Sequence, residues 1–160
     1  MDFPILSSLI LLPTIGALFI LLTKSNKDSS YKSAKYVALF TAFANFILSI
    51  YLWYYFDPSV SDFQFVENRV WLKGFINYKV GIDGISILFI ILTAFITPLC
   101  IVSVNSTVKY RLKDFLVAIL VMESLMIGVF CSLDLVIFYL FFEGGLIPMF
   151  LIIGIWGGER

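Results

Sequence analysis

Long apolar runs separated by short polar segments dominate the pattern of hydrophobic and polar residues along the chain. Five of these runs carry few or no charges, and they occupy residues 3–23, 36–56, 84–108, 115–133 and 135–158. Each is close to the roughly 20 residues that a helix needs to cross about 30 Å of hydrocarbon. The runs are continuously apolar rather than alternating, which favours helices over barrel strands. The pattern predicts an all-α, polytopic transmembrane fold with five spanning helices.

Composition supports a membrane protein and excludes two classes of function. Apolar residues make up 61% of the chain, mean hydropathy is +1.00 and only 14% of residues are charged, values outside the range of soluble domains and enzymes. Net charge is zero and no basic cluster is interleaved with aromatic residues, so nucleic-acid binding is excluded as well. Without repeats or linkers, residues 1–160 form one predicted transmembrane domain. We expect the first apolar run to be a retained span, because it is too long for a cleaved signal peptide.

The charges of the connecting segments predict the orientation in the membrane. The first and third connections, 24–35 and 109–114, are basic, the second, 57–83, mixes both signs, and the turn at Asp134 has no Lys or Arg. Basic loops stay on the cytoplasmic or matrix side, so the N-terminus is expected outside. The basic residues are Lys24, Lys27, Lys32, Lys35, Lys109, Arg111 and Lys113. Aromatic belts are then expected at the outer interface, from Trp53, Tyr54, Tyr55 and Trp71, and at the inner one, from Tyr110 and Trp156.

Two acidic residues, Glu123 and Glu143, fall inside predicted spans. Each lies about 10 residues from the turn that joins the fourth and fifth spans, and at 1.5 Å per residue both are roughly 15 Å deep. An ionisable group there costs at least about 2.5 to 3.5 kcal/mol, so it normally has a partner or a function. Proton transfer is the functional interpretation, and a permanently protonated carboxyl that hydrogen-bonds a neighbouring helix is the structural alternative. Whether the two carboxyls face each other depends on helix rotation, which the pattern leaves open.

The surroundings of Glu143 suggest a weakened helix. Gly144 and Gly145 remove side-chain bulk from one side, and Pro148 cannot donate a hydrogen bond to the carbonyl of Gly144. A freed carbonyl is a place where water or a partner side chain can enter. The alternative is that these residues only allow close helix packing. Pro13 and Pro98 are expected to kink the first and third helices.

The remaining polar and sulfur-containing residues have structural interpretations. Asp83 at the start of the third span is expected to cap that helix together with Ser86, and Asp134 is expected to face water in its turn. Histidine is absent, and Cys100 and Cys131 lack metal-ligand or CxxC spacing. We interpret both cysteines as packing residues and predict no metal site.

Three stretches carry a resemblance to a known family. They are "FDPSVSDFQFVE" (56–67), "YKVGIDGISILFIILTAFITPLCI" (78–101) and "LMIGVFCSLDLVIFYLFFEGGLIPMFLIIGIWGG" (125–158). Together they resemble the N-terminal part of NADH dehydrogenase subunit 4, an antiporter-like membrane subunit of respiratory complex I. The resemblance implies that Glu143, in the "FFE...LIPMF" motif, is the proton-pathway glutamate of the fifth helix. Glu123 matches an acid that only some members have, which implies an auxiliary role.

The resemblance also implies where the rest of the machinery lies. Flavin, iron–sulfur clusters and quinone are expected in other subunits, with no cofactor in this chain. Members continue into further helices that carry the lysine partner of the glutamate, and no Lys or Arg lies in the five predicted spans here. Either a second polypeptide, as from a split gene, supplies those helices, or the sequence is a fragment of a longer chain. Our hypothesis is the split subunit. The other expected partners are membrane-arm subunits of complex I and membrane lipid.

The function expected from these observations is that of a membrane-arm subunit, or a part of one, in a proton-translocating NADH:ubiquinone oxidoreductase. Its expected location is the mitochondrial inner membrane, with a bacterial inner membrane as the alternative. Two other functions stay open. One is a subunit of a multisubunit cation/proton antiporter, which has the same architecture but no flavin or iron–sulfur partners. The other is a structural assembly fragment with no proton traffic.

Overall fold

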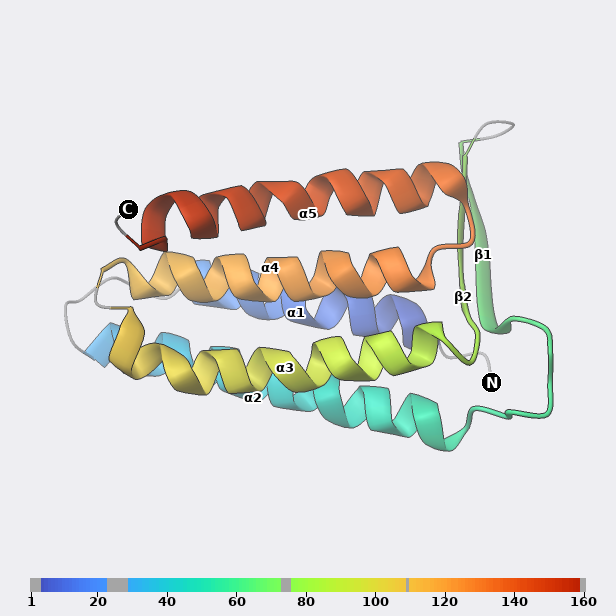
Figure 1. Cartoon of the computed structure of the whole chain (residues 1–160), viewed down its shortest axis with the longest axis horizontal. Helices are drawn as coiled ribbons and strands as arrows, with labels where there is room; N and C mark the ends of the chain where they lie inside the picture. Colours follow the sequence, from blue (N-terminus) through green and yellow to red (C-terminus); the bar gives the residue numbers. More distant parts are fainter. Residues whose placement is uncertain (1–3, 23–28, 73–75, 109, 159–160) are drawn as a thin grey trace.

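Five long helices account for most of the computed structural model, which describes residues 4–22, 29–72, 76–108 and 110–158 (Figure 1). They are α1 (Ile5–Leu22), α2 (Ser29–Tyr54), α3 (Ser86–Thr107), α4 (Leu112–Cys131) and α5 (Leu135–Trp156). Within these described residues, all five helices are long and apolar enough to cross a membrane, judged by length and composition. The prediction of an all-α fold with five spans is confirmed.

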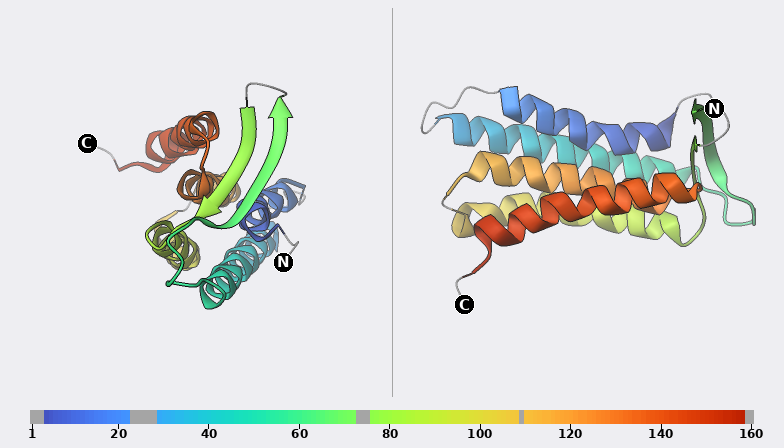
Figure 2. Two further views of the ribbon diagram at one scale, coloured as in Figure 1. Left: turned by 90° about the vertical axis from the view of Figure 1, so that its right-hand side faces the viewer. Right: turned by 90° about the horizontal axis from the view of Figure 1, so that it is seen from above.

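Helix α4 lies at the centre of the bundle and contacts each of the other four helices. The view along the helices shows α1, α2 and α3 around one side of α4, with α5 on the other side (Figure 2). Helix α5 packs chiefly against α4 and strand β2 (Ile76–Ile82). Two of its 22 residues are buried, against nine of the 20 residues of α4. Most of the α5 surface therefore points away from the other helices described here.

Four helices begin and end within three residues of their predicted spans, but α2 does not. It begins at Ser29, whereas its apolar run begins at residue 36. The added turns contain Lys32 and Lys35, whose long side chains can bring their ammonium groups to water while the backbone stays helical. Hydrophobicity thus located the span correctly but not the start of the helix. Each of α1, α3 and α5 continues as one helix through its proline.

An antiparallel hairpin, which the pattern of apolar runs did not predict, closes one end of the bundle. Strand β1 (Gln64–Leu72) pairs with β2, with Glu67 opposite Val80 and Arg69 opposite Tyr78. Val80 and Ile82 are fully buried among side chains of α1, α3 and α4. The alternation of Tyr78, Val80 and Ile82 is the period-two signal of a strand with one buried face. This alternation was present in the sequence, but it covers only a few residues and lies among charged ones such as Lys79 and Asp83, so it was not recognised as a strand.

Glu67 fixes this hairpin to the first helix. Its carboxylate accepts hydrogen bonds from the backbone N–H groups of Leu6, at 2.9 Å, and Ser7, at 3.2 Å. The Ser7 hydroxyl donates to the same carboxylate and lies 3.0 Å from the hydroxyl of Tyr78. A negative charge at a helix N-terminus satisfies otherwise unpaired N–H groups and interacts favourably with the helix dipole. Burial raises the pKa of the Tyr78 phenol, so this group stays neutral beside Glu67.

Replacing Glu67 with Ala should loosen the hairpin without disturbing the spans. The lost cap is expected to cost about 0.5 to 2 kcal/mol. Hydrogen exchange of the β1 and β2 amides, read by mass spectrometry, should therefore become faster. Asp62→Ala, which removes an exposed carboxylate from the loop before β1, is the matched control and should change little. Equal exchange in wild type and the Glu67→Ala variant would mean that the contact does not hold the hairpin.

Candidate functional site: two acids in the membrane helices

Glu143 lies on the outer face of α5. The face of α5 that packs against its neighbours contains buried Ile137 and Pro148 and half-buried Phe141. With 3.6 residues per turn, a position two residues after Phe141 points to the opposite side. Glu143 is exposed there, between exposed apolar residues such as Phe142 and Leu146. The carboxyl is thus directed away from α4, with an apolar surface around it.

The residues beside Glu143 combine an open side with a packed side. A Cβ added at Gly145 would meet no atom within 4 Å, whereas one at Gly144 would come within 3.4 Å of Leu125 on α4. Pro148 is buried. The predicted lack of bulk next to the acid is therefore found at Gly145. Gly144 and Pro148 instead form part of the packed α4–α5 surface. The phenol of Tyr139, one turn before Glu143, interacts electrostatically with the carboxylate.

Glu123 has the opposite setting, because it is buried in the bundle with 2% of its surface exposed. The side-chain amide of Asn45 on α2 donates a hydrogen bond to Oε1 of Glu123 at 2.9 Å. The next residue, Ser124, accepts a hydrogen bond from Thr14 of α1 at 2.8 Å and donates to the carbonyl of Ile10. Polar contacts at this level thus join α4 to both α1 and α2.

The two acids are not brought together within this chain. Glu123 is turned toward α2 in the interior, and Glu143 is turned away from α4. This answers the question of helix rotation that the sequence left open. A direct proton transfer between the two carboxyls has no support in this arrangement.

Sequence reasoning missed Asn45. Thr41, Asn45 and Ser49 form a buried stripe on α2 at four-residue intervals. The hydroxyls of Thr41 and Ser49 donate to carbonyls of their own helix, whereas Asn45 reaches across to α4. The signal was the i, i+4, i+8 spacing of polar residues in an apolar run, which marks the interior face of a membrane helix.

A partly open cavity of about 170 Å³ lies beside Glu123, between α3 and α4, and exposed residues such as Leu92 and Ile96 form part of its lining. It is lined almost entirely by apolar side chains, and its polar members are Thr93, Thr97, Cys100 and Glu123. The full lining is Phe89, Leu92, Thr93, Ile96, Thr97, Cys100, Ile119, Met122, Glu123, Met126 and Phe130. Cys100 is therefore a cavity residue, whereas Cys131 is fully buried in the core as predicted.

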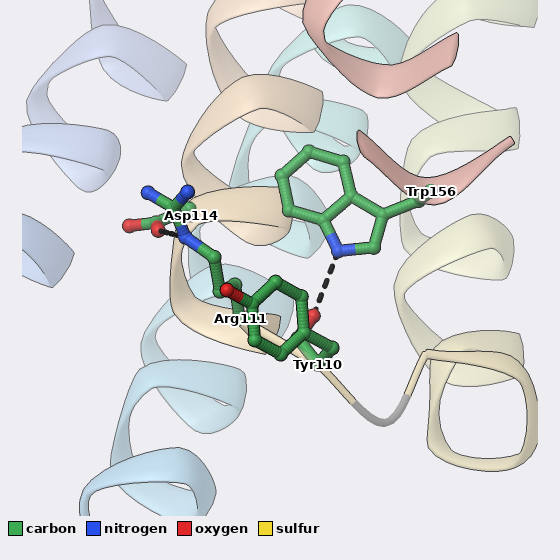
Figure 3. A network of polar contacts seen from close by, with 4 residues as sticks. All are labelled: Tyr110, Arg111, Asp114 and Trp156. Atoms are coloured by element: carbon green, nitrogen blue, oxygen red, sulfur yellow. Dashed lines mark hydrogen bonds and ion pairs between the residues drawn. The ribbon is translucent and has the colours of Figure 1, made fainter. Parts of the chain in front are cut away.

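The ends of the helices carry the expected aromatic residues. Trp156 at the end of α5 donates a hydrogen bond from its indole N–H to the carbonyl of Tyr110 at 2.7 Å, beside the Arg111–Asp114 ion pair (Figure 3). Both predicted inner aromatics thus lie at one end of the bundle. The structure describes neither the loop residues Lys24, Lys27 and Lys109 nor the side chain of Trp71. Which end faces the matrix or cytoplasm stays a prediction.

Two aspartates cap the helices at the hairpin end. Asp83 accepts from the N–H groups of Ile85 and Ser86, and its own N–H donates to the Ser86 hydroxyl, which confirms the predicted cap of α3. Asp134 was expected to face water in its turn, and its contact with Val136 is indeed exposed, but the residue also has a structural role that was not predicted. Its carboxylate accepts from the N–H groups of Val136 and Ile137 and caps α5. The reason is the usual one, that an Asp before a helix satisfies unpaired N–H groups.

The cap at Asp83 should weaken in acid. Its backbone hydrogen bond from Ser86 holds the pKa of Asp83 below the ordinary value of 3.8. The stabilisation is therefore fully present above pH 3.8 and is lost as the pH falls through the lower, folded-state pKa. Hydrogen exchange of the first α3 turn, corrected for intrinsic rates, should accelerate below pH 3.8 in wild type. Asp83→Asn, which can still accept a hydrogen bond but does not titrate, should lack this acid-dependent step, and its presence there would contradict the assignment.

The comparisons with known proteins cover the whole chain. It matches no protein-family model. It is 49% identical over 157 residues to NADH-quinone oxidoreductase subunit M of Rhodobacter capsulatus, covering 98% of this chain and 30% of that protein. It is 47% identical to NADH-ubiquinone oxidoreductase chain 4 of Mycosarcoma maydis, with 96% and 32% covered, and 46% identical to the same chain of Marchantia polymorpha, with 97% and 31% covered.

The chain spans about a third of the length of these relatives. Identities of 45–49% over essentially all of this chain confirm the resemblance noted in the "FFEGGLIPMF" and neighbouring stretches. The chain belongs, as an N-terminal part, to the family of NADH-quinone oxidoreductase subunit M and NADH-ubiquinone oxidoreductase chain 4.

Proposed function

We propose that this chain is the N-terminal helical part of a proton-translocating membrane subunit of NADH:quinone oxidoreductase. The observation that carries the proposal is identity of 45–49% over nearly the whole chain to relatives named as subunits of that enzyme. Five candidate spans suit a multi-pass subunit. The location is an inner membrane, mitochondrial or bacterial, since relatives of both kinds match.

Glu143 is the protonatable centre in this proposal. A carboxyl group on an apolar helix face has a large free-energy cost when it contacts lipid tails. It therefore needs polar or charged partner groups from outside α5. The exposed face of α5 around Glu143 is then an interface for the helices that follow in the longer family members, on this or a second polypeptide. A lysine from those helices would hold the carboxylate as an ion pair, and proton movement would make and break that pair.

Glu123 is an auxiliary proton site, separated from Glu143 by the α4–α5 contact. Oxidation of NADH and reduction of quinone belong to other subunits, which would carry the flavin and the iron–sulfur clusters. This chain contributes no redox group and responds to changes transmitted through its neighbours. Other membrane-arm subunits and lipid cover its remaining apolar surface.

Purification from native membranes tests the proposal. An affinity tag on this chain should recover flavin- and iron–sulfur-containing subunits, and the recovered complex should oxidise NADH with quinone as acceptor. A chain that copurifies only with other membrane subunits, and with neither flavin nor iron–sulfur clusters, would instead support a multisubunit cation/proton antiporter. That result would overturn the assignment.

A further inference from the structure

Two buried oxygen atoms beside Glu123 have no hydrogen-bond donor in the described part of the chain. They are Oε2 of Glu123 and Oδ1 of Asn45. The second polar atom of each side chain is already hydrogen-bonded, because Nδ2 of Asn45 donates to Oε1 of Glu123 at 2.9 Å. Both atoms left over are acceptors, and buried acceptors without a donor are strongly unfavourable.

The neighbouring hydroxyl groups cannot supply the missing hydrogen, because each donates elsewhere. Ser124 donates to the carbonyl of Ile10, and Thr14 donates to Ser124. The hydroxyls of Thr41, Ser49, Thr93 and Thr97 donate to backbone carbonyls of their own helices. Among the residues that line the adjacent cavity, none is a lysine, arginine or histidine. The described residues around Glu123 therefore offer no donor to Oε2 and, in the cavity lining, no positive charge to balance an ionised carboxylate.

We propose that Glu123 and Asn45 together form a proton-binding site between α2 and α4, in which protonated Glu123 donates from Oε2 to Oδ1 of Asn45. One hydrogen atom is then covalently bound to Oε2 of Glu123 and hydrogen-bonded to Oδ1 of Asn45, so neither oxygen is left unsatisfied. The acid and the amide form a closed pair, with the N–H of Asn45 donating to Oε1 and the O–H of Glu123 donating to Oδ1. Asn45 is a positioning residue that holds the neutral acid. The inference deepens the auxiliary role given to Glu123 above and rests on that proposed function.

The cavity between α3 and α4 supplies the exchange route. Its volume of about 170 Å³ is well above the roughly 10 to 15 Å³ that a single water requires. Thr93 and Thr97 line it, and their hydroxyl oxygens still have lone pairs that can accept hydrogen bonds from water. When the site loads, a hydronium ion in the cavity loses its proton, an O–H bond forms at Oε2, and a water molecule remains. Unloading reverses the same step.

Infrared spectroscopy of the purified complex that contains this chain, without NADH, tests the site. At neutral pH wild type should show the C=O stretch of a protonated carboxyl that is lost in Glu123→Gln. Asn45→Leu should shift that band to higher frequency, because the acid loses its hydrogen-bond partner. The double variant Asn45→Asp with Glu123→Gln exchanges acid and amide across the same pair and should restore a protonated-acid band near the wild-type frequency. A merely structural Asn45 would not produce this rescue.

Exchange into D₂O tests the cavity in the same samples. The Glu123 band should shift on deuteration in wild type, and Thr97→Leu, which fills the cavity beside Glu123, should slow that shift. Absence of a Glu123-dependent band, or a band that Asn45→Leu leaves unmoved, would overturn the proton site. An exchange rate unchanged by Thr97→Leu would overturn the cavity route. Because no turnover is involved, these outcomes are independent of whether Glu143 supports proton pumping.

Discussion

Glu143→Gln should abolish NADH-driven proton translocation while the complex stays assembled. Glutamine keeps the size of the side chain and most of its hydrogen-bonding capacity but has no titratable proton. Removal of a proton-transfer group typically lowers a rate by about 10²- to 10⁴-fold. Because residue 143 is exposed on the outer face of α5, the exchange leaves the packing between the described helices undisturbed and changes only the interaction with Tyr139 on the same helix. Proton uptake by a fluorescent pH-gradient dye in vesicles, with NADH as electron donor, measures the effect.

Tyr139→Phe is the matched control for this variant. Tyr139 lies one turn from Glu143, is itself exposed and interacts with the carboxylate. Its replacement removes the hydroxyl and keeps the ring, so assembly and most proton pumping should remain. Full pumping by Glu143→Gln would defeat the assignment of Glu143. If deletion of the chain then abolished assembly, the structural-scaffold function would be favoured.

Gly128→Ala should separate α4 from α5 and prevent stable assembly. A Cβ at residue 128 would lie 2.6 to 2.7 Å from Cδ1, Cε1 and Cγ of Phe141. Because Cγ is the attachment point of the ring, the phenyl group cannot escape by swinging only its tip. Overpacking of this kind costs about 1 to 3 kcal/mol, which exceeds the gain of up to about 1 kcal/mol that Ala brings to a helix over Gly.

The effect of Gly128→Ala can be read as lost assembled complex on native gels and a lower midpoint of thermal unfolding. Gly154→Ala on α5 is the matched control, since a Cβ there meets no atom within 4 Å. The control should be unchanged or slightly more stable. Two variants of equal stability would show that the close α4–α5 contact at Gly128 has been assigned wrongly.

The spans could be predicted because their cause is local. A run of about 20 apolar residues satisfies its backbone only as a helix in lipid, and the predicted and observed limits of four helices agree closely. Asp83 could be predicted as a cap because its partners are its sequence neighbours. The start of α2 at Ser29 was missed because hydrophobicity marks the membrane-embedded part of a helix and not its hydrogen-bonded length.

The partners of the two acids could not be predicted, because they depend on tertiary packing. The depth of Glu123 and Glu143 follows from residue counting, but the direction of each side chain follows from which face of its helix meets α4 or α5. Phe141 and Gly128 set that rotation by fitting together, and no local pattern identifies such a pair. The contact of Asn45 with Glu123 joins residues 78 positions apart. The hairpin docked by Glu67 is another long-range contact of this kind.

A side-chain-resolution map of the assembled complex would show what covers the outer face of α5. We predict a lysine from outside the five helices within hydrogen-bonding distance of the Glu143 carboxylate, with further helices packed over Gly145 and its neighbours. Lipid acyl chains in direct contact with Glu143, with no polar group or water near the carboxylate, would contradict the role of Glu143 as a protonatable centre.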